Sequence, residues 1–364
     1  MARPQEFVIY SRSETTQLSL IGPSTSKRKL PVNIKEGDLR LFEQALESHA
    51  AGSKLLTFNN VRINSDSLLF KRIRILPESF VGASLPTNYS SVRTLASYFI
   101  QDYLCSDKLS IPQPCIWFIN NWSRNYFHWL TDAIPRLFLV KHLIPTSVVL
   151  LPSRYQRFEY IKSSLRPFAI PDLRFIQEKQ ICLSRQLLLP SETAVTGNYN
   201  ETVIRKVRHF YAQFYSNRRS SRQFGDKIYI SRAKASRRRV LNECEVVDLL
   251  TRYGFLPMYF EDLSFEEQAT VCLKARYIVS NHGAGLTNML FMPAESCVLE
   301  LRKTNDCNNN CYFSLASALG LNYFYQACNC EDNNQDGHGN NVANLIVDVQ
   351  MLKETIELML GFEG

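Results

Sequence analysis

The 364-residue sequence lacks any apolar run of the about 18 residues that a membrane-spanning helix needs. The most apolar region, residues 137–151, is interrupted by Lys141, His142 and Pro145. The first residues, Met-Ala-Arg-Pro-Gln-Glu, lack the apolar core of a secretory signal. We therefore expect a cytoplasmic protein, with peripheral contact to the inner face of a membrane as the open alternative.

Several motifs of cofactor and metal chemistry are also absent. The chain has neither a Walker A sequence nor a Gly-x-Gly-x-x-Gly followed by an acidic ribose ligand, which disfavours a nicotinamide cofactor. No Asp-x-Asp stands at the end of an expected strand. Among the ten cysteines, Cys307, Cys311, Cys328 and Cys330 lie close together, but their spacings differ from the usual zinc patterns. We expect free thiols, no cofactor and no metal.

The composition is that of a globular protein, with 45% hydrophobic and 21% charged residues. The length exceeds what one core usually serves, so two domains are expected. The net charge of +8 is concentrated in residues 218–239, which contain nine Lys or Arg and one acidic residue, Asp226. Such a block indicates a solvated face or an anionic partner: a nucleotide diphosphate, a nucleic acid or a membrane surface.

After residue 110, expected strands alternate with expected helices, which is typical of parallel sheets covered by helices. The expected strands are residues 115–119, 148–151, 181–189, 227–231, 255–260, 277–281, 296–301 and 322–326, and the helices are residues 125–142, 155–165, 201–215, 242–253, 264–274, 312–318 and 351–360. We assign residues 1–100 to an irregular part of the first domain, with short strands at 7–10 and 68–75, residues 101–215 to its α/β body, residues 216–345 to a Rossmann-like second domain, and residues 346–364 to a helix that packs back on the first.

The most informative segment is the strand–turn–helix pattern of residues 277–288. A strand ending in Asn281 and His282 is followed by Gly283, Ala284 and Gly285 and then by a helix start. Free N–H groups at such a helix start bind anions, and small residues let a ligand approach the backbone. We predict that residues 282–285 and Asn288 bind a diphosphate. The alternative is a purely structural turn.

Charged residues follow two other strands of the second domain. Arg232 ends the strand at 227–231, at the sheet edge where ligands bind in open α/β sheets, and guanidinium groups match phosphate oxygens. Arg239 is a second candidate, with a solvated loop as its alternative. Glu300 ends the strand at 296–301, where it would hold a ribose or form an ion pair with a neighbouring basic residue.

The expected helix at 125–142 carries an ionisable stripe. Arg124, His128, Asp132 and Arg136 are spaced four apart, whereas most other positions are apolar. The stripe either forms an internal network that holds the fold or faces a cleft, where His128 or Asp132 would serve as a general base. Pro135 is expected to kink or restart the helix.

These segments together resemble glycosyltransferase family 61. The resemblance is carried by residues 125–136, 230–232, 239–243, 265–268, 280–288 and 298–301. That family includes plant arabinoxylan xylosyltransferases and animal enzymes that add N-acetylglucosamine to extracellular domains or O-mannose glycans. The resemblance implies a GT-B architecture, with two Rossmann-like domains facing across a cleft, and an inverting transfer from a nucleotide sugar. Because an anchor is lacking, we expect a bacterial-type member acting in polysaccharide biosynthesis.

The predicted reaction is the transfer of a hexose or pentose to a glycan or lipid-linked glycan. Asp132, oriented by His128, would take the proton of the acceptor hydroxyl; in the alternative, His128 takes the proton and Asp132 orients it. Arg124 and Arg136 would lie on the acceptor side. Arg232, Arg239 and the helix start at Gly283 would stabilise the leaving diphosphate without a metal. Two rivals remain: a GT-B epimerase or phosphorylase, and a nucleic-acid-binding protein, although its basic block lacks interleaved aromatics. The oligomeric state is left open.

Overall fold

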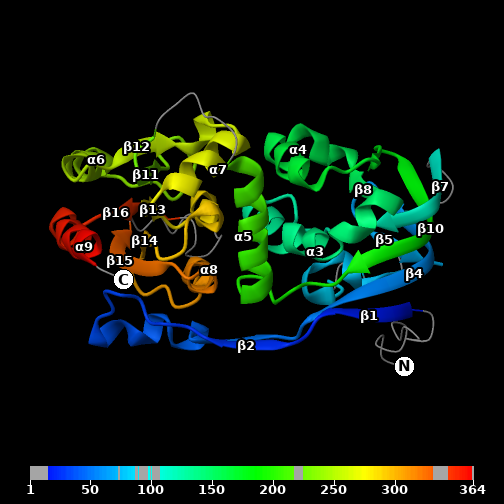
Figure 1. Cartoon of the computed structure of the whole chain (residues 1–364), viewed down its shortest axis with the longest axis horizontal. Coiled ribbons are helices and arrows are strands. Elements are labelled where there is room, and N and C mark those ends of the chain that lie inside the picture. Colours follow the sequence, from blue (N-terminus) through cyan, green and yellow to red (C-terminus); the bar gives the residue numbers. More distant parts are fainter. Residues whose placement is uncertain are drawn as a thin grey trace.

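The computed structural model describes residues 15–72, 74–86, 89, 97–98, 100, 107–216, 224–330 and 343–362. Within these residues the chain forms two lobes, each built on its own large sheet, and helix α5 (Glu201–Tyr215) runs between them (Figure 1). The fold is therefore α/β, as the alternating pattern predicts. The expected strand at 7–10 and the basic residues Arg218, Arg219 and Arg222 lie outside the described residues.

The first lobe contains an eight-stranded mixed sheet in the order β6-β5-β4-β10-β7-β8-β9, with β1 also paired to β4. Its strands are β1 (Thr15–Ile21), β4 (Ser53–Asn64), β5 (Leu69–Lys71), β6 (Arg74–Ile75), β7 (Asp107–Ile116), β8 (Val148–Pro152), β9 (Leu173–Ile176) and β10 (Gln180–Pro190). Strands β10, β7, β8 and β9 are parallel, whereas β4 runs antiparallel to β10. The expectation of a parallel arrangement is thus met for half of this sheet, since the N-terminal residues add antiparallel strands.

The second lobe contains five parallel strands in the order β12-β11-β13-β14-β15, followed by the short antiparallel β16. These are β11 (Lys227–Ser231), β12 (Leu256–Tyr259), β13 (Tyr277–Asn281), β14 (Cys297–Lys303), β15 (Asn322–Cys330) and β16 (Leu345–Ile346). In sequence order the strands read 2-1-3-4-5, which is a doubly wound topology. The strand order reverses between β11 and β13, and in such sheets a ligand crevice lies outside the carboxyl ends at that point.

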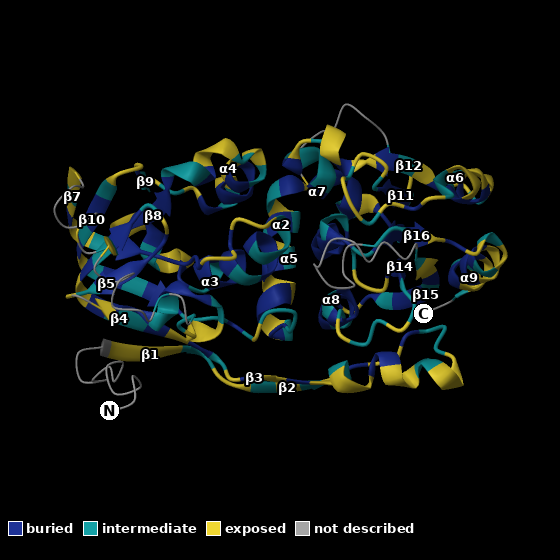
Figure 2. Cartoon of the chain, turned by 180° about the vertical axis from the view of Figure 1, so that it is seen from behind, coloured by how far each residue is buried: buried dark blue, intermediate teal, exposed yellow. Residues whose placement is uncertain are grey.

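Alternate residues of these strands enter different cores. Tyr229, Val279 and Leu299 pack with α6 (Glu243–Arg252) and α9 (Val349–Gly361). Ile230, Ile278 and Val298 face the opposite core, with α7 (Phe265–Lys274), α8 (Cys311–Leu319) and the 3₁₀ helix η13 (Ala284–Phe291). The two-residue period of a strand explains this division. Figure 2 shows the strands buried between helices that are exposed on their outer sides.

Helix α5 links the lobes, because its residues Val203, Val207 and Tyr211 belong to the core that contains both α3 (Ile134–Leu139) and α8. The Asn200 side chain caps the helix by accepting a hydrogen bond from the Val203 N–H. The capping box that Ser264 and Glu267 predict for α7 is also present.

Two segments far apart in the sequence, helix α9 and residues 24–50, pack on the second lobe. Helix α9, expected to pack toward the first domain, lies instead against β15 and α6, because Leu352, Ile356 and Met359 form its buried face. Residues 24–50, here called the strap, contain β2 (Ser24–Lys27), η3 (Glu36–Leu41) and β3 (Glu47–Ala50) and run below both lobes (Figure 1). The strap meets the second sheet where the Val32 N–H donates to the Tyr323 carbonyl at 2.9 Å.

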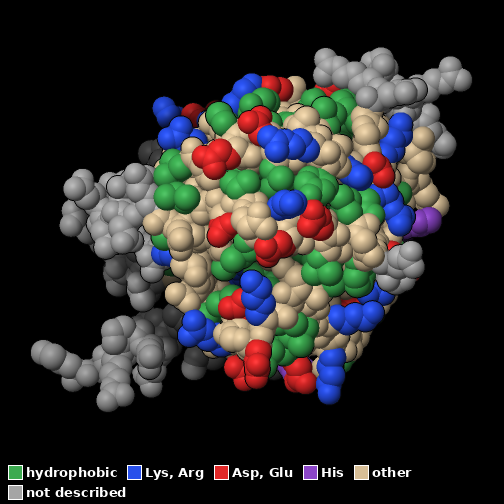
Figure 3. Space-filling view, turned by 90° about the vertical axis from the view of Figure 1, so that its left-hand side faces the viewer, with side chains coloured by type: hydrophobic (Ala, Val, Ile, Leu, Met, Phe, Trp, Pro, Cys, Tyr) green, Lys and Arg blue, Asp and Glu red, His purple; other side chains and the backbone are tan. Residues whose placement is uncertain are grey.

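Charges of both signs are intermixed on the face of the second lobe that Figure 3 presents. In the part of the chain that the structure describes, no helix combines the length and the apolar character needed to cross a bilayer. Across those same residues, no group of three or more His, Cys, Asp or Glu side chains is arranged to hold a metal ion. Cys307, Cys311, Cys328 and Cys330 are free thiols.

Candidate functional site

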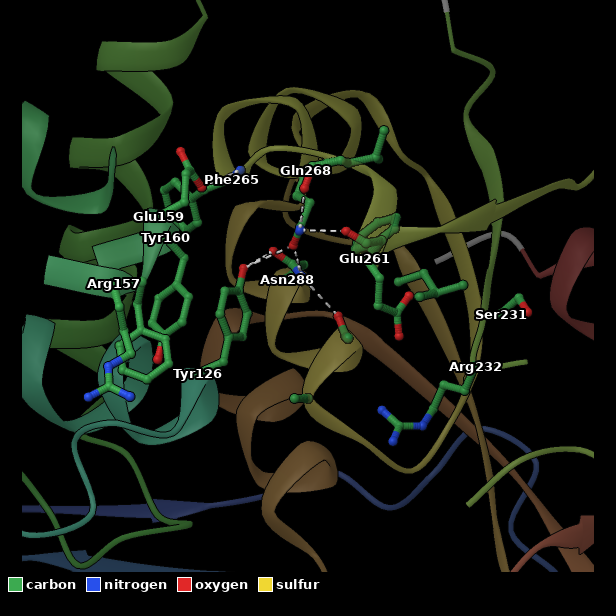
Figure 4. A pocket seen from close by; sticks show the side chains of 16 residues that line it. Tyr126, Arg157, Glu159, Tyr160, Ser231, Arg232, Glu261, Phe265, Gln268 and Asn288 are labelled. Carbon is green, nitrogen blue, oxygen red and sulfur yellow. Dashed lines mark hydrogen bonds between the residues drawn. The ribbon is translucent and has the colours of Figure 1, made fainter. Parts of the chain in front are cut away.

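A cavity of about 360 Å³ lies at the carboxyl end of the second sheet, where the strand order reverses. Its first-lobe lining is Tyr126, Arg157, Phe158, Glu159 and Tyr160, and its second-lobe lining is Ile230, Ser231, Arg232, Phe260, Glu261, Leu263, Phe265, Gln268, Ala284, Gly285 and Asn288 (Figure 4). The cavity therefore lies between the lobes, at the position that doubly wound topology assigns to a ligand.

Arg232 extends from the end of β11 into this region (Figure 4). Its guanidinium lies so close to Gly283 that a Cβ added there would be 2.6 Å from Nη1. Burial lowers the pKa of Arg232, and Arg238 lowers it further, whereas Glu261 opposes the change. Its buried Nε has no hydrogen-bond partner within the described residues. A half-buried cation with an unused, buried Nε donor at the cavity wall fits an anionic ligand.

The turn after β13 brings the backbone close to β11. Gly283 precedes η13, so the expected helix start is present and is 3₁₀ in type. A Cβ on Gly285 would lie 3.0 Å from Cγ2 of Ile230, so the close approach favours glycine here. Asn288 is fully buried; it accepts a hydrogen bond from the Tyr126 hydroxyl and donates to the Gly285 carbonyl. Asn288 thus holds the shape of the cavity wall.

His282 and Glu300 form a buried pair beside this turn. Nδ1 of His282 lies 2.5 Å from one carboxylate oxygen of Glu300, and the Tyr323 hydroxyl donates to the other oxygen at 2.5 Å. Burial acts to raise the pKa of the Glu300 carboxyl, but His282, Arg302 and Tyr323 outweigh it and hold the pKa below its usual value. Glu300 does not line the cavity, and both of its oxygens are engaged.

The structure places Arg239, the second arginine predicted from the sequence, differently from its neighbour Arg238. The Arg239 side chain is exposed, and its backbone pairs with Leu345 and Asn344. Arg238 instead lies with His282 and Lys303 around a second hollow of about 70 Å³. Arg238 therefore shares a hollow with His282, whereas Arg239 does not line it.

The ionisable stripe is brought together only in part. Nδ1 of His128 lies 2.8 Å from Oδ2 of Asp132, and the Thr196 hydroxyl donates to the same oxygen at 2.7 Å. Arg136 is buried and donates from Nε to the Pro190 carbonyl, and burial lowers its pKa to about 10 although Glu192 and Asp132 oppose the shift. The Arg124 side chain is exposed.

The helix that carries the stripe is interrupted at the expected position. An α-helical turn (α2, Tyr126–His128) passes into a π-helical turn (Trp129–Ala133) and then into α3. Pro135 has no N–H to bond to Thr131, and the Ile134 N–H reaches the Trp129 carbonyl instead. Such π-helical turns occur often at functional sites.

Two aromatic rings separate the His128–Asp132 pair from His282. The His128 ring contacts Phe127, Phe127 contacts Tyr312, and Tyr312 contacts His282, with centroid distances of 5.1, 5.6 and 5.0 Å. Neither His128 nor Asp132 lines the cavity that contains Arg232. The two candidate groups are thus linked through an aromatic pair and do not contact each other directly in this chain of rings.

Sequence reasoning missed several residues of this site. Tyr126 and Gln268 lie within the segments that carry the family resemblance, and that signal could have identified them. Thr196 and Tyr312 come from a loop and from a helix of otherwise apolar character, so no pattern singles them out. Glu261 follows β12, the strand next to β11, and only the strand order reveals its position at the cavity.

Comparison with known proteins confirms part of the resemblance. The model of the family Glycosyltransferase 61 matches residues 126–299, from α2 to β14. The chain is 36% identical over 98 residues to the EGF domain-specific O-linked N-acetylglucosamine transferase of Drosophila melanogaster, covering 26% of this chain and 18% of the relative. It is 24% identical over 228 residues to the protein of that name from Gallus gallus, covering 55% and 41%. It is also 24% identical over 228 residues to the protein of that name from Mus musculus, covering 55% of this chain and 42% of the relative.

The matched part of the chain thus spans less than half of each of these relatives. The segment matched by the family model includes His128 and Asp132, and also Arg232 and the turn after β13. These relatives are animal proteins, and they give no support to the expected bacterial capsular type.

Proposed function

We propose that the chain is a glycosyltransferase that moves a sugar from a nucleotide-diphosphate sugar to a hydroxyl acceptor. The observation that carries the proposal is the half-buried guanidinium of Arg232, whose buried Nε has no hydrogen-bond partner among the described residues, at the switch-point cavity of a doubly wound sheet. The family match over residues 126–299 supports it, because the matched segment contains this cavity. A GT-B arrangement, with the cavity between two facing lobes, is part of the proposal.

The donor would bind with its diphosphate near Arg232. This guanidinium stays charged despite burial and lies over the backbone of Gly283, at the start of η13. His282 lies next in the chain and is held by Glu300, so we assign Glu300 to positioning His282 and not to the ribose. When the bond between the sugar and the diphosphate breaks, these fixed groups would stabilise the charge on the leaving oxygen without a metal.

The acceptor would react from the side of His128 and Asp132. One of the two takes the proton of the acceptor hydroxyl while its oxygen attacks the anomeric carbon, which inverts that centre. Thr196 orients Asp132 by hydrogen bonding. The transferred sugar would occupy the space between Arg232 and His128, beside Phe127 and Tyr312. The relatives' printed names make N-acetylglucosamine the first sugar to test and an EGF domain one acceptor to test beside glycans.

The decisive experiment measures donor binding and transfer separately. Calorimetry with a panel of nucleotides and nucleotide sugars should show binding to the wild-type protein, weakened at least about tenfold in Arg232→Ala. Arg237→Ala, in the same loop but with an exposed side chain, is the matched control and should bind normally. Asp132→Asn should keep donor affinity and lose about 10²–10⁴ in transfer rate. Absence of nucleotide binding in the wild-type protein would overturn the proposal.

A further inference from the structure

We propose that Trp122 is the platform on which a pyranose ring of a carbohydrate acceptor stacks while one of its hydroxyls reaches the His128–Asp132 pair. This inference rests on the proposed function and adds the chemical class of the acceptor. The chain has three tryptophans. Trp117 and Trp129 are completely buried, whereas 47% of the Trp122 surface is exposed.

The exposed indole is held on a rigid turn. The Asn120 side chain accepts hydrogen bonds from the Trp122 N–H and from the Ser123 hydroxyl, both at 3.0 Å. The Ser123 hydroxyl in turn accepts from the Asn120 N–H at 3.0 Å. The Asn120 amide also donates to Glu192, which anchors the turn to the chain after β10. Because the turn is ordered before any ligand arrives, stacking on the indole costs little additional ordering.

The indole lies directly beside the candidate general base. Its ring centroid is 5.0 Å from that of His128, with the planes tilted by 54°. The His128 and Asp132 side chains are 19% and 13% exposed, so both remain accessible at the edge of this surface. Val195, which precedes Thr196, is 67% exposed. An apolar platform and a proton-accepting pair are thus presented to solvent together.

A sugar ring is the acceptor chemistry that fits this combination. A pyranose has an apolar C–H face that packs on an aromatic ring, and its rim carries the hydroxyls that donate to His128 or Asp132. A serine or threonine side chain has the hydroxyl but no flat apolar face. A membrane surface would require a contiguous apolar patch, whereas the residues flanking Trp122 are Asn121 and Ser123.

The platform can be tested without measuring transfer, because Trp122 is the exposed tryptophan. Acrylamide quenching of tryptophan fluorescence should be strong in the wild-type protein and reduced by millimolar cello-, xylo- or chito-oligosaccharides. In Trp122→Phe the quenching and its protection should disappear, since both remaining tryptophans are buried. With a transferable donor, Trp122→Ala should raise the acceptor KM at least about tenfold, and Trp122→Phe should recover part of the loss.

Each result decides a different point. If none of the oligosaccharides protects Trp122, or if a serine-containing peptide protects it instead, the carbohydrate platform is wrong. If Trp122→Ala changes nucleotide affinity as much as it changes the acceptor KM, the residue acts on the whole site and the proposal also fails. Absence of nucleotide binding by the wild-type protein would refute the proposed transferase function. The quenching measurement would still show whether Trp122 binds carbohydrate.

Discussion

The hydroxyl of Tyr126 donates a hydrogen bond of 2.7 Å to Oδ1 of Asn288, and this bond joins the first lobe to η13 of the second. Gln268 completes the contact, because its Oε1 lies 3.2 Å from both the Tyr126 hydroxyl and Nδ2 of Asn288. Burial raises the pKa of Tyr126 well above its ordinary value, so the phenol remains a donor. One side chain of α2 therefore fixes the wall of the cavity.

Replacing Tyr126 by Phe should destabilise the protein by about 1–3 kcal/mol, because Asn288 and Gln268 lose a buried donor. Urea denaturation measures this cost. Tyr253→Phe is the matched control, since that hydroxyl donates to Glu357 at the surface and its loss should cost less. Equal costs for the two variants would show that the contact between the lobes adds nothing.

Glu300→Gln should change how stability depends on pH. The pKa of Glu300 is depressed in the folded protein, so its contribution is fully present above the unfolded value of about 4.5 and is lost as pH falls through the depressed folded value. The variant should therefore unfold more easily at neutral pH and show a shallower loss of stability in acid. Urea midpoints from pH 3 to 7 test this. Glu357→Gln, at an exposed carboxylate, should keep the wild-type slope.

Gly283→Ala should weaken nucleotide binding with a small effect on stability. The added methyl would lie 2.6 Å from Nη1 of Arg232 and would displace the guanidinium. The backbone itself is extended at this residue, with φ 168°, so alanine brings no strain. Calorimetry with the nucleotides of the panel measures the loss. Gly37→Ala, where nothing lies within 4 Å of the new methyl, should bind like the wild type.

Phe42→Ala should cost about 3–5 kcal/mol, because the strap inserts this ring into the second lobe. The ring is completely buried, lies 5.0 Å from both Phe313 and Tyr325, and packs under the guanidinium of Arg302. Thermal or urea unfolding gives the cost. Leu39→Ala, in the same strap but 43% exposed, should change stability little. Similar unfolding of the two variants would show that the strap is held elsewhere.

The second lobe was predictable from sequence because its elements have strong local signals. The expected strands 227–231 and 277–281 coincide with β11 and β13, and the expected helix 264–274 lies within one residue of α7. Continuous apolar runs mark buried parallel strands, and a capping box marks a helix start. The carboxyl ends of these strands therefore located Arg232 and His282 before their contacts were known.

The rest depended on contacts that no local pattern encodes. The strands within residues 15–64 depend on pairing between distant parts of the chain, since β1 pairs with β4 and β4 pairs with the distant β10. The spacing of four predicted that Arg124 and Arg136 share one helix face with His128 and Asp132. The π-helical turn rotates the residues that follow it, and only His128 and Asp132 form a contact. The sequence favoured Arg239 over Arg238, because the backbone pairing of Arg239 with the distant Leu345 is not visible in any local pattern.

The strap also determines which stretches of the chain the second lobe needs in order to fold on its own. The Asn33 side chain donates to the Tyr325 carbonyl and accepts from the Tyr325 N–H, so an amide group completes the pairing of β15 as a neighbouring strand would. A fragment that began at β11 would expose that backbone together with the hydrophobic surface beneath Phe42. A soluble second lobe would therefore have to be assembled from two distant stretches of chain, for example by circular permutation that joins residues 24–50 to residues 224–362.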